Sequence, residues 1–261
     1  MAFVKGMCYD SDLYANAYEL SQDKLIAAAE KNDMYAMTVL AIKLREEEAG
    51  YPYEPARALA LLQNAAGMNF APAQIILAES YRDGVGIPQN EALAVKWFQK
   101  AIERGAISAY MQLGLIYLRS PKTEAAAVDL LLHAAENDDT NAMYFMANLY
   151  REGRVVEHDP YEGFKWMQKA AGQNDDLAQV TMAYMLMVGE GCNQDEYTAV
   201  PIMKKWAEAD HPEALYSMAQ MYLKGIGVEQ DFDKGQECLE LSAELGHEKA
   251  IVMLAEYSAD S

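Results

Sequence analysis

The stretch Pro72–Ile107, PAQIILAESYRDGVGIPQNEALAVKWFQKAIERGAI, decides the fold of this 261-residue chain. Its first part carries small and large apolar residues at the spacing of one helical face. Gly84 and Gly86 then permit the positive φ angles that a helix end and a tight turn need. Asn90 can accept a hydrogen bond from a free N–H group at the start of a second helix. The stretch therefore predicts a helical hairpin with a glycine turn.

Most of the chain repeats this hairpin with a period close to 36 residues. One alanine marks the same position in each copy: Ala36, Ala73, Ala109, Ala142, Ala178, Ala214 and Ala250. Leucine or methionine, a small residue and a large apolar residue follow at offsets 4, 5 and 8, on the same helical face. Asp159, Asp195 and Asp231 repeat the helix-start signal of Asn90. The pattern predicts an all-α repeat protein.

We expect one domain, residues 1–261, that contains six complete helix pairs. Their expected ranges are 35–71, 72–107, 108–140, 141–176, 177–212 and 213–248. A single helix at 13–31 is expected to precede them, and a capping helix at 248–258 is expected to close the array. The fourth copy has Val155 where the second turn glycine belongs.

The repeated motifs are similar to those of the Sel1-like repeat family. Three copies carry the resemblance: Tyr81, Gly84, Gly86, Asn90, Lys96, Trp97, Lys100 and Ala101 in one, Lys165, Trp166, Lys169, Ala170 and Ala171 in another, and Gly225, Gly227 and Val228 in a third. The resemblance covers nearly the whole chain, whereas the 34-residue tetratricopeptide repeat fits the period less well. It implies an α/α superhelix (solenoid) with a concave groove lined by the first helices. It also implies an adaptor role in protein complexes, as most family members have.

The composition narrows the class of partner. Forty acidic and 21 basic side chains give a net charge of −19, which would repel nucleic acid and anionic membranes and would favour a basic protein. Cys8, Cys192 and Cys238 cannot form a disulfide framework, which fits a reducing, cytoplasmic compartment. The N-terminus lacks the apolar run of a signal peptide or of the lipoprotein signal that Cys8 would require, and we expect no membrane span.

No motif predicts catalysis, a cofactor or a metal ion. The GxG turns follow helices rather than strands, so we interpret them as turns and not as phosphate cradles. Ser21 and Lys24 match the SxxK pattern of serine β-lactamases, but the SDN and KTG partners of that pattern are missing. The four histidines lack the further ligands that zinc needs nearby.

One set of residues is a candidate binding row. On tetratricopeptide-like geometry, offsets 2, 6, 9 and 10 of the first helices face the groove. The candidates at these offsets are Arg45, Ile75, Glu79, Arg82, Arg119, Tyr144, Asn148, Arg151, Tyr184, Tyr216, Gln220 and Lys224. Tyrosine and arginine are the residue types that anchor protein partners. The alternative is that the basic residues only stabilise helix C-termini. A binding row predicts that replacing Arg82, Tyr144 and Arg151 together abolishes partner binding without unfolding the chain.

The leading functional hypothesis is a non-catalytic adaptor that binds a protein or peptide in its groove. A narrower alternative is a cytoplasmic bacterial immunity or regulatory protein that inhibits a basic toxin or enzyme, because acidic charge speeds such an association. A third alternative is a hydrolase, for which no nucleophile and base can be placed on neighbouring helices. The sequence predicts neither the oligomeric state nor the identity of the partner.

Overall fold

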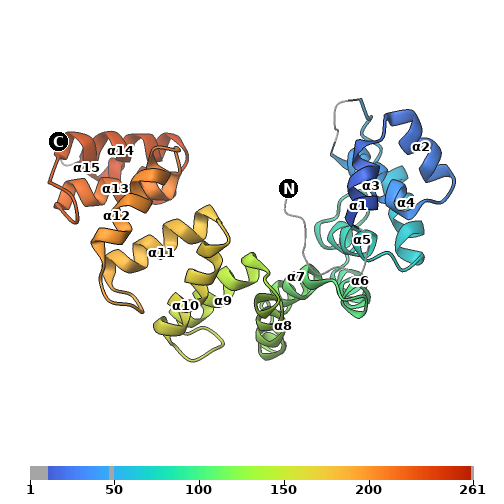
Figure 1. Ribbon diagram of the computed structural model, residues 1–261, viewed down its shortest axis with the longest axis horizontal. Coiled ribbons are helices and arrows are strands. Elements are labelled where there is room, and N and C mark those ends of the chain that lie inside the picture. Colours follow the sequence, from blue (N-terminus) through green and yellow to red (C-terminus); the bar gives the residue numbers. More distant parts are fainter. Residues whose placement is uncertain (1–10, 47–49, 260–261) are drawn as a thin grey trace. The chain divides into compact units, whose positions relative to one another are not determined.

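The computed structural model describes residues 11–46 and 50–259, which form fifteen α-helices and no strand (Figure 1). The all-α solenoid class is therefore confirmed. These residues fall into two compact units, with the division between Asp139 and Thr140. The single 1–261 solenoid stays a prediction, and each unit is described by itself.

Unit 1 contains eight helices within its described residues. They are α1 (Ser11–Glu19), α2 (Gln22–Glu30), α3 (Met34–Arg45), α4 (Pro55–Gly67), α5 (Ala71–Asp83), α6 (Glu91–Glu103), α7 (Ile107–Tyr117) and α8 (Glu124–Glu136). The helix expected at 13–31 was wrong, because two helices occupy that range. Ser21 has the extended backbone of a helix-starting residue, with φ −60° and ψ 154°, and this conformation separates α1 from α2.

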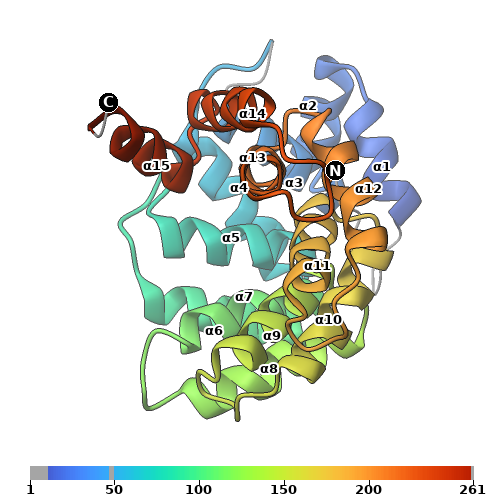
Figure 2. The ribbon, with the colours of Figure 1, turned by 90° about the vertical axis from the view of Figure 1, so that its left-hand side faces the viewer.

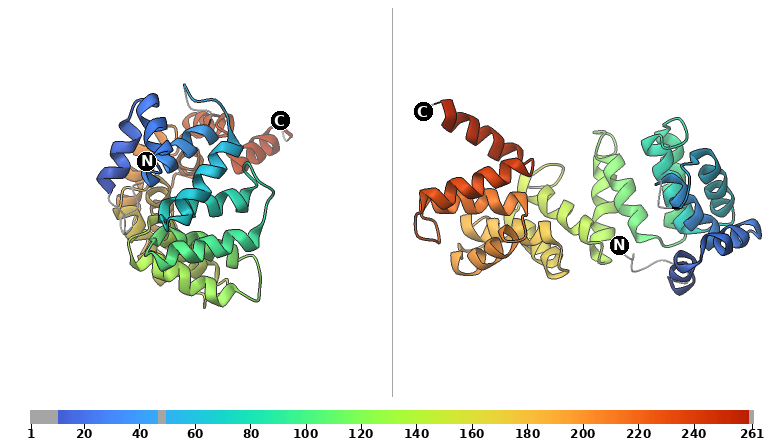
Figure 3. Two further views of the ribbon diagram at one scale, coloured as in Figure 1. Left: turned by 90° about the vertical axis from the view of Figure 1, so that its right-hand side faces the viewer. Right: turned by 90° about the horizontal axis from the view of Figure 1, so that it is seen from above.

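Unit 2 contains seven helices within its described residues. They are α9 (Thr140–Glu152), α10 (Pro160–Gly172), α11 (Asp176–Val188), α12 (Glu196–Ala207), α13 (Pro212–Lys224), α14 (Phe232–Glu244) and α15 (Glu248–Ala259). Within each unit, the two helices of a pair pack against each other, and each second helix also packs against the first helix that follows it in the same unit (Figures 2 and 3). The helix α15 lies where the capping helix was expected.

The repeated alanines form the contact between helices. Each of the seven marker alanines is at most 1% exposed, and large side chains such as Phe98 and Met167 fill the space beside them without exposure. Because alanine lacks a bulky side chain, it lets a neighbouring helix approach closely, and burial of the larger apolar groups stabilises the stack. The core of each unit is therefore built from alanines at the helix contacts and from large apolar side chains between them.

The second helices begin where the sequence predicts. The side chains of Asn90, Asp159, Asp195 and Asp231 each accept a hydrogen bond of 3.0 Å from the backbone N–H three residues later. These bonds satisfy one of the free donors that every helix start leaves. The start of each of these second helices is thereby held by a local contact.

The glycine turns join the two helices of a repeat and contact the preceding repeat. A Cβ atom added to Gly191 would lie 1.9 Å from the carbonyl oxygen of Pro160, the first residue of α10. Only glycine fits this approach, and the φ of +71° at Gly191 also favours glycine. In the fourth repeat Val155 adopts a φ of +70°, which is a strained backbone for a β-branched residue.

Candidate protein-binding surface

Arg151 is the best-held residue of the predicted row. Its Nε and one terminal nitrogen donate to the two carboxylate oxygens of Glu190, over 2.8 and 2.9 Å, and its other terminal nitrogen donates to Asn148 over 2.9 Å. Arg151 and Asn148 come from α9, whereas Glu190 lies in the glycine turn after α11. A two-point ion pair of this kind fixes the plane of the guanidinium and connects two successive repeats.

The surroundings of Arg151 include two predicted tyrosines. Burial opposes the charge on Arg151, but the hydrogen bonds and negative charge of Glu190 outweigh burial and raise the pKa of the guanidinium. Tyr144 and Tyr184 lie close enough to act on the pKa of Arg151 in the same direction. Tyr144, Asn148, Arg151 and Tyr184 are therefore brought together, as the repeat offsets predict.

The helix α11 adds an exposed apolar stripe beside this group. Leu177, Tyr184 and Val188 are 40%, 42% and 53% exposed, and their spacings of seven and four residues place them on one helical face. Only Tyr184 was predicted. The signal for Val188 was present, because the equivalent positions in the other five repeats hold the charged residues Glu46, Asp83, Arg119, Glu152 and Lys224.

The α13 helix contributes three further predicted residues. Tyr216 is half-buried and stacks on His247 with 4.7 Å between ring centroids. The Nε2 atom of His247 lies 2.7 Å from a carboxylate oxygen of Glu213. Glu213 therefore holds the imidazole ring on which Tyr216 stacks. Gln220 is half-buried and Lys224 is exposed in the last turn of α13.

Unit 1 carries a different version of the row. Arg82 donates to both carboxylate oxygens of its neighbour Asp83, over 2.7 and 2.8 Å, and also reaches Gln112 in the next repeat. Burial raises the pKa of Glu79, although the charges of Arg82 and Arg45 oppose this rise. Three predicted residues, Arg45, Glu79 and Arg82, are thus electrostatically connected across α3 and α5.

The remaining arginines of unit 1 differ in exposure. Arg45 is half-buried, and its Nε atom is buried without a hydrogen-bond partner. Arg119 is exposed and pairs with Glu91 of α6 at 3.6 Å, and its charge also helps to lower the pKa of Asp83, the partner of Arg82. A pair this open to solvent contributes little to stability.

The placement of Ile75 on a free surface was wrong. Its side chain is 7% exposed and belongs to the apolar cluster that includes Ala78 and Phe98. Offset 2 is buried in three other repeats, at Thr38, Met111 and Val180, so this position faces the neighbouring helices. Only the large ring of a tyrosine, as at Tyr144 and Tyr216, is partly exposed there.

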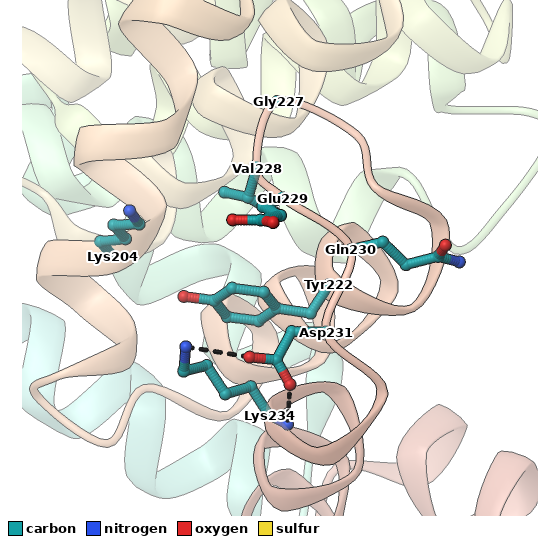
Figure 4. A pocket seen from close by; sticks show the side chains of 8 residues that line it. All are labelled: Lys204, Tyr222, Gly227, Val228, Glu229, Gln230, Asp231 and Lys234. Atoms are coloured by element: carbon teal, nitrogen blue, oxygen red, sulfur yellow. Dashed lines mark hydrogen bonds and ion pairs between the residues drawn. The ribbon is translucent and has the colours of Figure 1, made fainter.

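A hollow that sequence reasoning missed lies at the edge of unit 2. It has a volume of about 460 Å³ and is lined by Lys204, Tyr222, the 227–231 turn and Lys234. Figure 4 shows the ring of Tyr222 at its centre, with Glu229 on one side and the ion-paired Asp231 and Lys234 on the other. Lys204 extends from α12 on the opposite wall. The hollow carries both signs of charge.

The two described cysteines are free thiols. Cys238 was expected to be buried and inert, and it is half-buried, as is Cys192. Burial raises the pKa of both thiols, and nearby carboxylates add to the effect. Both thiols are therefore less reactive than an ordinary exposed cysteine at neutral pH.

The described residues contain neither a cluster of metal ligands nor a helix able to span a membrane. Among residues 11–46 and 50–259, no group of three or more histidine, cysteine, aspartate or glutamate side chains is arranged to hold a metal ion. Within the same ranges, every helix is too short or too polar to cross a membrane.

Comparison with known proteins places the fold. One curated relative, the alginate biosynthesis protein AlgK of Azotobacter vinelandii, is 34% identical over 104 residues, which cover 39% of this chain and 22% of that protein. A protective antigen of uropathogenic Escherichia coli with an SLR fold matches with a TM-score of 0.77 and 27% identity. That match covers 88% of this chain and 50% of the antigen, so the chain spans about half of it.

Two further crystal structures have the same fold. A Sel1 repeat protein from Oxalobacter formigenes matches with a TM-score of 0.73 and 25% identity, over 89% of this chain and 97% of that one. An immunity protein from Pseudomonas aeruginosa matches with a TM-score of 0.53 and 20% identity, over 81% of each chain. At that identity the second likeness shows the fold alone.

The family model supplies the remaining evidence. The Sel1 repeat model matches residues 71–105, 140–175, 176–211 and 212–247, which together make up more than half of the chain. These ranges coincide with the helix pairs that begin at α5, α9, α11 and α13. The chain therefore belongs to the Sel1 repeat family.

Proposed function

We propose that this protein is a non-catalytic adaptor that binds a protein partner on the first-helix surface of unit 2. The observation that carries the proposal is the apolar stripe of α11, Leu177, Tyr184 and Val188, beside the fixed guanidinium of Arg151. Exposed apolar groups next to a held arginine are the combination found at the centres of protein interfaces.

The rigidity of this surface supports the proposal. Arg151 is held by Glu190 and Asn148 before any partner arrives, and Tyr216 is held by its stack on His247. Side chains that are already ordered lose less conformational entropy on binding. Because the stripe lies on one helix, a partner that presents a short apolar segment flanked by polar groups would fit it.

The experiment compares two triple variants of the full chain. The first carries Leu177→Ser, Tyr184→Ser and Val188→Ser, which removes the stripe from exposed positions. The control carries Tyr53→Ser, Met68→Ser and Leu245→Ser, which removes three other exposed apolar groups. Partners are isolated on the wild-type chain, identified by mass spectrometry, purified and titrated against all three proteins by calorimetry.

We expect the stripe variant to lose at least tenfold in affinity and the control variant to stay within twofold of wild type. Three exposed apolar groups of this size support such a loss. Circular dichroism checks that both variants keep their helices. Equal affinities of the wild-type and stripe variants for every purified partner would overturn the proposed site.

A narrower form of the proposal is that the partner is a toxin or enzyme that the chain inhibits. The net charge of −19 supports a basic target, because opposite charge accelerates association. The neighbouring genes would distinguish this role from that of a general adaptor, since an inhibitor is expected beside the gene for its target.

The same reasoning extends to the compartment. We propose a cytoplasmic location, which the two free thiols of the described residues and the odd cysteine count support. Cell fractionation with an antibody against the chain tests it, and recovery outside the cytoplasm would contradict it. No cofactor is proposed for the adaptor role.

A further inference from the structure

Three large aromatic side chains stand exposed at the starts of the second helices of unit 2. Tyr161 of α10 is 61% exposed, Tyr197 of α12 is 92% exposed and Phe232 of α14 is 64% exposed. Each is the first or second residue of its helix. Tyr197 and Phe232 lie outside the apolar clusters described for α11–α15, so packing in those clusters does not explain their presence.

Unit 1 provides the comparison. The second residues of α4, α6 and α8 are Ala56, Ala92 and Ala125, and all three are exposed. Alanine therefore satisfies the repeat at the position of Tyr161 and Tyr197. Phe232 is the first residue of its helix, where the second helices of unit 1 have Pro55, Glu91 and Glu124. The aromatic residues of unit 2 add a large exposed apolar surface that the fold does not require.

The three aromatic residues lie along one continuous edge. The turn at Gly191 contacts Pro160 and Tyr161 at the start of α10, and it leads directly into Tyr197. The turn at Gly227 contacts Glu196 and Val200 at the start of α12, and it leads into Phe232. Figure 1 shows these connections on the same side of unit 2. The hollow of Figure 4 is lined by this second turn, residues 227–231.

Negative charge surrounds the aromatic residues. Each of the three helix starts carries two carboxylates, at Asp159 and Glu162, Asp195 and Glu196, and Asp231 and Asp233. Residues 140–261 contain 21 of the 40 acidic side chains but only nine of the 21 basic ones. Hydrogen bonds from Thr198 and Lys234 lower the pKa values of Asp195 and Asp231, so both stay ionised at neutral pH.

One ring of this edge already has a cation beside it. The Nζ atom of Lys165 lies 5.1 Å from the ring centroid of Tyr161 and also pairs with Glu162. A cation is thus held between an aromatic ring and a carboxylate at this edge. Tyr197 and Phe232 offer the same combination of ring and carboxylate.

We propose that this aromatic edge of unit 2 binds an extended, arginine- and lysine-rich segment of a partner protein. The guanidinium groups of the segment lie over the rings of Tyr197, Phe232 and Tyr161, and its charges face the carboxylates at the helix starts. The edge is separate from the first-helix stripe, so the inference does not depend on the proposed adaptor site.

The test uses a fluorescein-labelled 16-residue peptide of alternating arginine and serine, titrated against the full chain by fluorescence anisotropy at about 0.1 M salt. The row variant carries Tyr161→Ala, Tyr197→Ala and Phe232→Ala, which keeps the charge and, at the first two positions, uses the residue that unit 1 has there. The control variant carries Tyr53→Ala, Met68→Ala and Leu245→Ala. The Leu177→Ser, Tyr184→Ser and Val188→Ser protein tests independence from the other surface.

We expect the row variant to bind the peptide about tenfold more weakly than wild type, whereas the other two variants keep their affinity within twofold. A loss of at least fivefold that is confined to the row variant supports the edge. A smaller loss would mean that charge alone attracts the peptide and would overturn the proposal. Failure of the wild-type chain to bind the peptide, or an equal loss in the control variant, would also overturn it.

Discussion

The two units place an arginine at the same repeat position and hold it in different ways. Arg82 of unit 1 forms its two-point ion pair with Asp83, the next residue on its own helix. Arg151 of unit 2 forms the equivalent pair with Glu190, which is 39 residues away in the turn of the next repeat. The first pair is local, whereas the second connects two repeats. The repeat fold therefore does not determine the ion-pair partner of this arginine, and the partner differs between the two units.

The glycine turns show a second difference. Gly86 of unit 1 and Gly191 of unit 2 have the same φ of +71° and pack against the proline that starts the preceding second helix. An added Cβ would lie 2.9 Å from the Cβ of Pro55 in unit 1 but 1.9 Å from the carbonyl oxygen of Pro160 in unit 2. The contact of Gly191 with the preceding repeat is therefore closer than that of Gly86.

Breaking these turns gives the largest expected effect. We expect Gly191→Ala to lower the free energy of unfolding by about 3 kcal/mol, because the left-handed backbone and the clash with Pro160 add together. Gly86→Ala should cost only about 2 kcal/mol, since the nearest atoms of Pro55, its Cβ and its carbonyl oxygen, would lie 2.9 and 3.1 Å from the added Cβ. Urea unfolding followed by circular dichroism measures both. Equal losses of stability in the two variants would contradict the conclusion that Gly191 packs more closely against the preceding repeat than Gly86 does.

Removing the arginines is expected to give an intermediate effect. Arg151→Met should lower the free energy of unfolding by about 2 kcal/mol, because it leaves the half-buried carboxylate of Glu190 without its donors. Arg82→Met should cost less than about 1 kcal/mol, since Asp83 is 45% exposed and water can replace the arginine.

The Arg151 variant has a matched control. Glu190→Gln keeps the shape of the turn and removes only the charge, so it should cost less than Arg151→Met. The same urea titration compares the three proteins. Equal stability of Arg151→Met and Arg82→Met would mean that the pair with Glu190 does not stabilise the contact between repeats.

Local signals made the helices predictable. The side chains of Asp195 and Asp231 accept hydrogen bonds from N–H groups only three residues later, so the residue type predicts the helix start. The 36-residue period is also visible in the sequence alone. The ion pair of Arg151 with Glu190 was not predictable, because repeat offsets assign a residue to a face but do not measure its reach into the next repeat. Ile75 was misplaced for a related reason, since offset 2 lies at the boundary between core and surface.

The helix break at Ser21 shows a limit of apolar periodicity. The apolar pattern continues through this position, whereas the backbone at Ser21 is extended. Serine favours a helix start but also occurs inside helices, so the residue type alone did not separate the two outcomes. Tyr161 and Tyr197 were visible as departures from alanine, but only the exposure of Tyr197 and Phe232 shows that the core does not use them.

The smallest expected effect concerns Glu79, whose equivalent in unit 2 is Asn148. Burial raises the pKa of Glu79 above its ordinary value, despite the opposing charges of Arg82 and Arg45. The folded state therefore holds the proton more tightly than the unfolded state, and ionisation of Glu79 lowers stability as the pH rises through the raised pKa. Glu79→Gln makes unit 1 resemble unit 2 and removes this loss.

We expect Glu79→Gln to raise the free energy of unfolding at pH 7, by less than about 1 kcal/mol because the site is partly open to solvent. The gain should disappear at a pH below the ordinary pKa of a glutamate, where the wild-type side chain is neutral in both states. Urea midpoints measured across this range test the sign. A variant that is less stable than wild type at pH 7 would show that attraction to Arg82 and Arg45 exceeds the cost of burying the carboxylate, and unit 1 would then depend on its charged row as unit 2 depends on Arg151.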